Sequence, residues 1–146
     1  MEQKRWSVNL HRTSLLLSDL QHFAYQESVP DKNGQFRIVS RTEIIGPNDV
    51  CTDSYLIIGA SEDKSIVENG YKYIQTRFAR FLLMLAVSSI NLSPDKFQFI
   101  PLQDFTERSD IDWNKTIVEI DQQFYRKYEL SDEEISFIER MIKPVQ

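Results

Sequence analysis

Hydrophobic and polar residues alternate in the first part of the chain, and this pattern predicts short strands separated by turns. A loose alternation runs over residues 6–12, and a short apolar run covers residues 55–58 just before Gly59. Both have the length and composition of strands. Turn signals occupy residues 30–34, with an Asn-Gly pair, and residues 46–49, with a Gly-Pro pair. We therefore expect a small sheet before residue 60.

A helical period replaces the alternation after Ser61, a residue type that caps helix N-termini. The acidic pair Glu62 and Asp63 follows, where the helix dipole favours negative charge. Apolar residues then recur at spacings of three and four and form one stripe: Tyr71, Ile74, Phe78, Leu82 and Leu85. The pattern predicts one long helix over residues 61–88, with Gly70 as a place for a break or kink.

The last third of the chain predicts a short strand over residues 97–101, an acidic linker over residues 104–115, and two amphipathic helices. The second of these helices has a clear start, because Ser131 and Glu134 have the spacing of a capping box. Pro144 ends it.

Together these patterns predict an α+β fold with a small mixed sheet, one long packed helix and a helical C-terminal tail. We expect a body over residues 1–106 and an acidic linker with a two-helix tail over residues 107–146. With 146 residues, of which 41% are hydrophobic, the chain can bury a core of its own.

Charge is distributed unevenly along the sequence. Residues 1–103 contain 11 Lys and Arg against 11 Asp and Glu, whereas residues 104–146 contain 6 against 11 and supply the whole net charge of −5. Neutralisation of phosphates by basic residues provides most non-specific affinity for DNA. An acidic chain of this kind is therefore a poor DNA-binding protein on its own.

Cysteine content and hydropathy indicate a cytoplasmic protein that does not span a membrane. The single cysteine, Cys51, excludes an internal disulfide and a multi-cysteine metal site. The longest apolar run, residues 81–87, is far shorter than the ~20 residues that a membrane helix needs. The N-terminal residues show no apolar signal region.

Residues typical of catalysis are scarce. His11 and His22 are not spaced as metal ligands, and Cys51 has no histidine near it in sequence. The four glycines are too scattered for a phosphate-binding loop. One metal-dependent nuclease pattern remains as a minor alternative, in which Asp31 and the segment 62–64 (Glu-Asp-Lys) would hold Mg²⁺. Helix-dipole and turn preferences explain these acidic residues without a metal.

Basic residues supply the candidate binding surface. Lys72 and Arg80 fall on one side of the long helix with Arg77 beside them, and Arg37 and Arg41 share one face of a strand after the first turn. Arginine presents a fork of donors to phosphates and base edges. The alternative is an ordinary solvated helix face. The polar side chains of the loop between strands complete the candidate DNA contacts: Asn48, Thr52 and Ser54.

Several sequence blocks resemble the C-terminal end of bacterial restriction-modification enzymes, the large N6-adenine DNA methylases that often have a fused or companion endonuclease. The resemblance covers residues 43–144 in the same order. Its blocks are residues 46–59 (ending CTDSYLIIG), 73–82 (YIQTRFARFL), 97–105 (FQFIPLQDF), 133–139 (EEISFIE) and 142–144 (IKP).

In that family the C-terminal region is thought to read the target sequence on double-stranded DNA. Upstream domains bind S-adenosylmethionine and transfer the methyl group. The motif that positions the target adenine and the glycine-rich cofactor loop are both missing from this sequence. The resemblance thus implies a non-catalytic target-recognition module without its own cofactor, which works with an upstream methylase domain or subunit. It also implies that most non-specific affinity would come from those other parts.

A protein-interaction module is the alternative. The two predicted tail helices have an acidic exposed side and could dock a methylase or nuclease subunit. The sequence favours the simpler interpretation, in which these helices cap the core of this domain.

Overall fold

A computed structural model describes residues 6–11, 30–39, 42–47, 49–50, 55–87 and 94–145 of the chain. Its three strands are β1 (Trp6–His11), β2 (Thr42–Ile45) and β3 (Tyr55–Ser61). They form a sheet in the order β2-β1-β3, and β1 runs antiparallel to both neighbours. The prediction of a mixed sheet is therefore wrong for the described strands. Outside these strands, Phe36 and Ile142 form an isolated parallel bridge.

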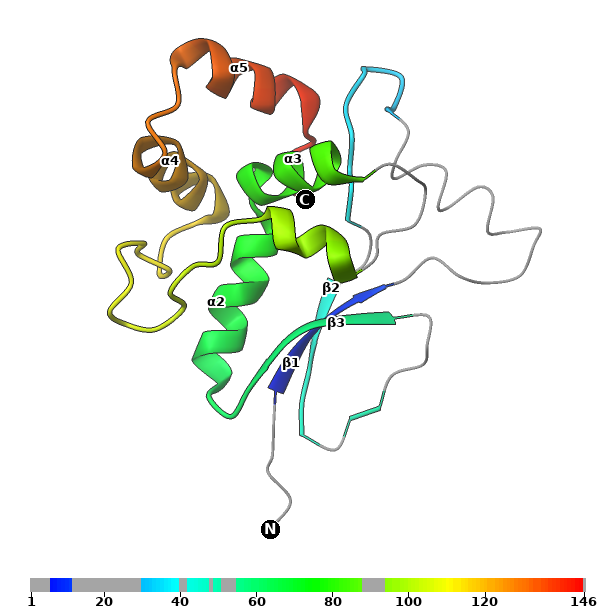
Figure 1. Ribbon diagram of the computed structural model, residues 1–146, viewed down its shortest axis with the longest axis vertical. Helices are drawn as coiled ribbons and strands as arrows, with labels where there is room; N and C mark the ends of the chain where they lie inside the picture. The colour runs from blue at the N-terminus through cyan, green and yellow to red at the C-terminus, as the bar shows by residue number, and fades with distance from the viewer. Residues whose placement is uncertain are drawn as a thin grey trace, which may run out of the picture.

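The predicted long helix is two helices, α2 (Lys64–Gln75) and α3 (Arg77–Ala86), which meet at Thr76 (Figure 1). Thr76 has extended backbone angles, and its hydroxyl accepts a hydrogen bond from the backbone N–H of Ala79. Threonine is a good N-cap and a mediocre helix-interior residue, so it ends one helix and begins the next. The break thus falls at Thr76, and α2 continues through Gly70.

Residues 94–99 (Pro94–Phe99) form a short 3₁₀ helix, η1, in place of the predicted strand over 97–101. Proline favours the first turn of a helix, and Asp95 follows it where negative charge is favourable. The alternation of Phe97 and Phe99 extends over too few residues to distinguish a strand from a helical turn. The spacing of Phe97 and Phe99 therefore did not predict the secondary structure of this segment correctly.

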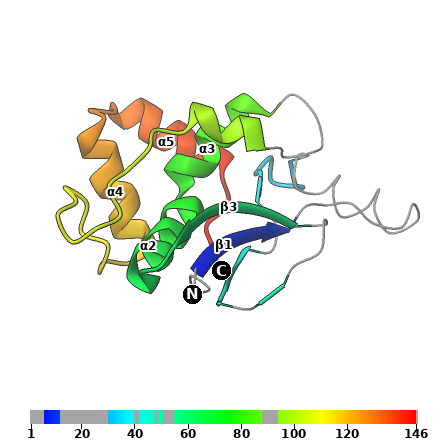
Figure 2. The ribbon, with the colours of Figure 1, turned by 60° about the horizontal axis from the view of Figure 1, so that its bottom comes forward.

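Two C-terminal helices confirm the predicted helical tail: α4 (Ile117–Lys127) and α5 (Asp132–Met141). The capping box of Ser131 and Glu134 is confirmed, and a second one joins Thr116 to Glu119 at the start of α4. Figure 2 shows these helices gathered with α2 and α3 to one side of the sheet.

One hydrophobic cluster among the described residues connects the four α-helices. Tyr73 and Phe78 contribute to it from α2 and α3, while Phe124 and Ile138 contribute from α4 and α5. The rings of Phe78 and Phe124 stack with their centroids 5.1 Å apart. The two sides of the predicted boundary at residues 106 and 107 therefore share one core. Helices account for most of the regular structure described, which confirms the predicted combination of strands and helices in part.

The described helices are all too short or too polar to cross a membrane.

Candidate functional site

The junction between α2 and α3 is held by a carboxylate from the C-terminal part of the chain. Asp121 on α4 accepts hydrogen bonds from the backbone N–H groups of Arg77 (3.0 Å) and Phe78 (2.9 Å). These are the first N–H groups of α3, which have no partner within the helix. Asp121 is 4% exposed, and burial raises its pKa to about 6 against the opposing effect of the same hydrogen bonds and of Arg80. Asp121 therefore fixes the start of α3.

Two of the three basic residues that were predicted to form a binding face, Lys72 and Arg77, make hydrogen bonds to other parts of the same chain. The Lys72 ammonium donates a hydrogen bond to the backbone carbonyl of Trp113. Arg77 donates from Nε to the carbonyl of Ile142 at 3.1 Å, and its Nη1 lies 3.9 Å from a carboxylate oxygen of Glu139. Because the helix breaks at Thr76, these residues do not share one helix face. Their predicted DNA contacts remain predictions.

Arg80 is the third residue of that set, and it is buried, with 3% of its surface exposed. Its Nε donates to the carbonyls of Gln75 and Thr76, both at 3.2 Å. Burial lowers the pKa of Arg80 to about 10, with Asp121 acting in the opposite direction and Arg77 and Arg37 lowering it further. The guanidinium is thus still charged at neutral pH, and it is anchored from one side.

The remaining side of Arg80 has an unsatisfied donor. Among the described residues, two buried side-chain polar atoms have no hydrogen-bond partner, Arg80 Nη2 and Tyr125 Oη. A buried donor without a partner is costly, about 1–3 kcal/mol and more for a charged group. Such atoms call for a specific explanation, for instance a bound ion or ligand.

Arg80 lines a cavity of about 450 Å³ whose walls come from distant parts of the chain. Arg37 and Lys143 bring two more positive charges to it. Among the described residues, none of those that line the cavity has a carboxylate side chain. The lining residues are Gln35, Arg37, Val39, Thr42, Tyr71, Gln75, Arg80, Lys143, Pro144 and Val145. We call this space the basic cavity.

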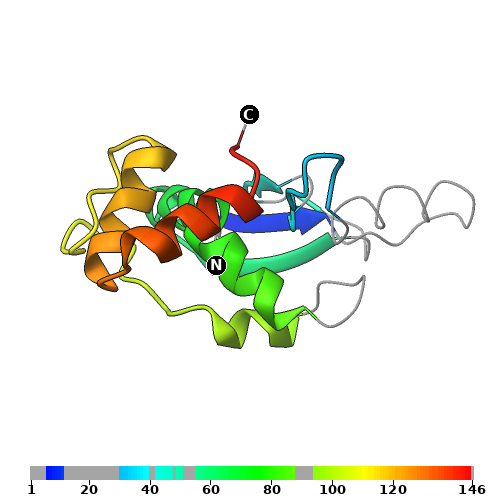
Figure 3. The ribbon, with the colours of Figure 1, turned by 90° about the horizontal axis from the view of Figure 1, so that it is seen from above.

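The C-terminal segment forms one wall of the basic cavity because residue 36 holds it in place. Phe36 donates its N–H to the carbonyl of Met141 (2.7 Å) and accepts at its own carbonyl from the N–H of Lys143 (3.0 Å). The Lys143 ammonium also lies 2.6 Å from Asp31, whose pKa this contact lowers to about 2. Figure 3 shows the C-terminal segment beside the 30–39 segment at one end of the sheet.

The basic cavity contains Arg37 and Arg80 of the predicted DNA-binding set. Arg37 is exposed. It does not lie on a strand, because residues 37–39 form none and Ile38 has a positive φ of 69°. The remaining predicted contacts lie outside the described residues: Arg41, Asn48, Thr52 and Ser54.

Sequence reasoning missed Lys143, Tyr71 and Gln75 as residues of the cavity. Tyr71 looked like a member of the apolar stripe of a long helix. Lys143 looked like part of a separate tail, because its place in the lining of the cavity depends on the pairing of Phe36 with Ile142. The one available signal was the closing block of residues 142–144 in the family resemblance.

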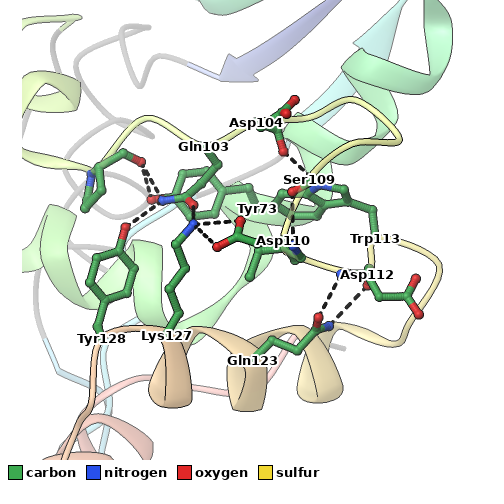
Figure 4. Close-up of polar contacts among 12 residues, drawn as sticks. Tyr73, Gln103, Asp104, Ser109, Asp110, Asp112, Trp113, Gln123, Lys127 and Tyr128 are labelled. Carbon is green, nitrogen blue, oxygen red and sulfur yellow. Dashed lines mark hydrogen bonds and ion pairs between the residues drawn. The ribbon is translucent and has the colours of Figure 1, made fainter.

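A second polar cluster, on the segment 101–113, has a different character (Figure 4). Lys127 donates to Gln103 Oε1 at 2.8 Å and to Asp110 at 2.9 Å, and Gln103 in turn donates to the hydroxyl of Tyr128 at 2.9 Å. Gln123 fixes the backbone of Asp112 from both sides, with hydrogen bonds of 2.7 and 3.2 Å. These paired groups attach the segment to α4.

Two acidic residues of the nuclease alternative, Asp31 and Asp63, have structural roles. Asp31 accepts hydrogen bonds from the backbone N–H groups of Asn33 and Gln35 and pairs with Lys143. Asp63 is the N-cap of α2. Over the part of the chain that the structure describes, no group of three or more His, Cys, Asp or Glu side chains could hold a metal ion.

No protein family, curated protein sequence or solved structure matches this chain.

Proposed function

We propose that the chain is a non-catalytic, cytoplasmic DNA-target-recognition module with an α+β fold, the C-terminal region of a restriction-modification adenine methylase or restriction enzyme. In this proposal double-stranded DNA is its ligand. An upstream methylase domain or subunit binds S-adenosylmethionine and carries out the reaction. The sequence blocks over residues 43–144 and the basic cavity support the proposal.

The observation that carries the proposal is the basic cavity with its unpaired Arg80 donor. Arg37 and Arg80 lie close enough for the charge of one to lower the pKa of the other, and no carboxylate of the described lining separates them. Asp121 offsets part of this repulsion at Arg80, and an anion bound between the two guanidinium groups would offset more of it. Arginine forks match the geometry of phosphate, and phosphate contacts fix the register of a protein on DNA.

The acidic composition is compatible with such a role if the phosphate contact is local. Arg37 and Arg80, with Lys143 paired to Asp31 beside them, provide one local contact, while the net charge of −5 limits non-specific binding of the rest of the surface. Most of the affinity would then come from the upstream parts.

The test is DNA binding by the protein joined to its methylase domain or subunit, measured across a range of salt concentrations. Arg37→Ala is the informative variant, because Arg37 is exposed and forms part of the cavity. Arg126→Ala is the matched control, since it removes the same charge from an exposed position on α4. Loss of one phosphate contact should weaken binding and reduce the salt dependence of log K by about 1. Equal effects of the two variants would contradict the proposal.

A second candidate function, a protein-interaction module, is favoured by one observation. An apolar cavity of about 240 Å³ lies between β3, α2 and residues 97–105. Leu102, which lines it, is 91% exposed, and Phe99 nearby in sequence is 58% exposed. Apolar surface of this kind marks contact sites for proteins. If this candidate is correct, Leu102→Asp abolishes assembly with the methylase subunit, whereas Arg37→Ala does not affect assembly.

A further inference from the structure

We infer that the basic cavity accepts one unpaired nucleotide, with its phosphate between Arg37 and Arg80 and its base between Tyr71 and Gln75. This inference rests on the proposed function, because it names the ligand of the same cavity. It extends that proposal from a phosphate on the surface of a duplex to a nucleotide that leaves the stack.

The phosphate end of the cavity is defined by the fixed orientation of Arg80. Its Nε is tied to the carbonyls of Gln75 and Thr76, so the guanidinium plane is set before a ligand arrives. Its Nη2 is a buried donor without a partner, and Arg80 is one of the residues that line the cavity. Arg37 supplies a second guanidinium from the facing segment. A preorganised charged donor of this kind binds an anionic oxygen at little entropic cost.

The cavity is much larger than a phosphate group needs. Its volume of about 450 Å³ lies within the range of roughly 300–1,000 Å³ for sites that hold drug-sized ligands. A ligand that contributed only a phosphate would leave most of this space to water. A nucleotide unit would fill more of it.

The rest of the lining fits a base and a sugar. Tyr71 offers an aromatic ring, against which any base can stack. Gln75 is 8% exposed, and a glutamine amide matches the donor and acceptor pattern of a base edge. Val39 and Pro144 add apolar surface. Bases inside a duplex are stacked and paired, so a base reaches such a cavity only from a single strand or after it has left the helix.

Isothermal titration of the full chain with small ligands tests the inference directly. The probes are the four deoxynucleoside 5′-monophosphates, the four matching deoxynucleosides and inorganic phosphate. We expect at least one mononucleotide to bind about tenfold more tightly than both inorganic phosphate and its own nucleoside, because stacking adds to the phosphate contact. Equal binding of phosphate and mononucleotides, or no mononucleotide binding, overturns the inference.

Variants separate the two ends of the ligand. Tyr71→Ala should weaken mononucleotide binding about tenfold and leave phosphate binding unchanged, while Tyr71→Phe keeps the ring and the affinity. Arg37→Ala should weaken both ligands, and Arg126→Ala neither. Arg80→Lys keeps the charge but loses the fork, so both ligands should bind more weakly. If this variant does not fold, Arg37→Ala tests the same end. Unchanged mononucleotide affinity in Tyr71→Ala or in Arg37→Ala contradicts the assignment of that end.

The outcomes also distinguish the inference from the proposed function. If DNA binding depends on Arg37 but mononucleotides do not bind, the cavity contacts phosphates of the duplex, and only the inference fails. If mononucleotides bind but DNA does not, the site takes free nucleotides, and the proposed function fails.

Discussion

Two clusters of charged and polar side chains flank the hydrophobic core, and they differ in how completely their groups are paired. At the segment 101–113, the Lys127 ammonium contacts Gln103 and Asp110, and the Gln103 amide donates a hydrogen bond to the Tyr128 hydroxyl. At the junction of α2 and α3, Arg80 is anchored through Nε, whereas its Nη2 has no partner, and the residue is part of the lining of the basic cavity. The sequence indicated Arg80 as a binding candidate and none of the residues Gln103, Asp110 and Lys127.

Structural and ligand-binding cations therefore differ in how many of their donors have a hydrogen-bond partner, more than in their charge. A cation with partners on every side contributes to stability and has little left for a ligand. A cation held from one side, with a buried donor free on the other, is less stable by itself and gains from an anion. Lys127 belongs to the first kind and Arg80 to the second. The following four predictions test this distinction.

The largest effect is expected for Asp121→Ala. The substitution leaves two N–H groups of α3 without their acceptor and removes the negative charge that raises the pKa of Arg80. Removing one partner of a buried charged pair costs roughly 3–5 kcal/mol. Urea denaturation should therefore show a loss of this size in the free energy of unfolding. Glu107→Ala, at an exposed position, is the control and should change it by less than about 0.5 kcal/mol.

The pH dependence of stability should change in Asp121→Asn. Burial raises the pKa of Asp121 from 3.8 to about 6, so the folded protein holds this proton more tightly than the unfolded chain. Its contribution to stability is therefore greatest below pH 3.8 and falls as the pH rises through about 6. Relative to the non-titrating variant, the wild type should lose about 2–3 kcal/mol between roughly pH 3 and pH 7. A constant difference in urea denaturation over that interval would show that Asp121 ionises normally.

Lys127→Met should reduce stability without reducing ligand binding. The variant keeps the apolar stem and removes the ammonium that pairs with Gln103 and Asp110. We expect a loss of about 1 kcal/mol in the free energy of unfolding, because the ion pair is partly exposed. DNA affinity measured by fluorescence anisotropy should stay at the wild-type level. A weaker affinity would place Lys127 in the binding surface and break the distinction.

Lys143→Met should produce the smallest change of the four. In contrast to Lys127→Met, it should reduce DNA affinity and leave the free energy of unfolding nearly unchanged. Its ammonium contacts Asp31 at a partly exposed position, so the urea midpoint should barely change. DNA affinity should fall roughly two- to five-fold, because one of the three cations of the basic cavity is removed. Full affinity together with a large loss of stability would show that Lys143 is a structural residue only.

The sequence was most informative where the signal is local. The capping box of Ser131 and Glu134 predicted the start of α5 correctly, because both partners lie within one helical turn. Thr76 was missed as a break, since its preference for a cap competes with a strong apolar stripe on either side. The outcome there depends on Asp121, whose carboxylate accepts a hydrogen bond from Arg77 N–H, 44 positions earlier in the chain.

The basic cavity could be predicted only in part, for the same reason. Arg37 and Arg80 were recognised as binding candidates from their residue type. Their proximity follows from long-range contacts, above all the pairing of Phe36 with Ile142 that brings in Lys143. The burial of Arg80 depends on where α2 ends, which the periodicity of the sequence did not fix.

The most direct test of the central claim is nuclear magnetic resonance of the arginine side chains during titration with DNA or a mononucleotide. The account predicts saturable shifts of the Arg80 and Arg37 guanidinium signals with a common dissociation constant, and no shift for Arg126. Signals of Arg80 that stay unchanged while the ligand binds elsewhere would contradict it.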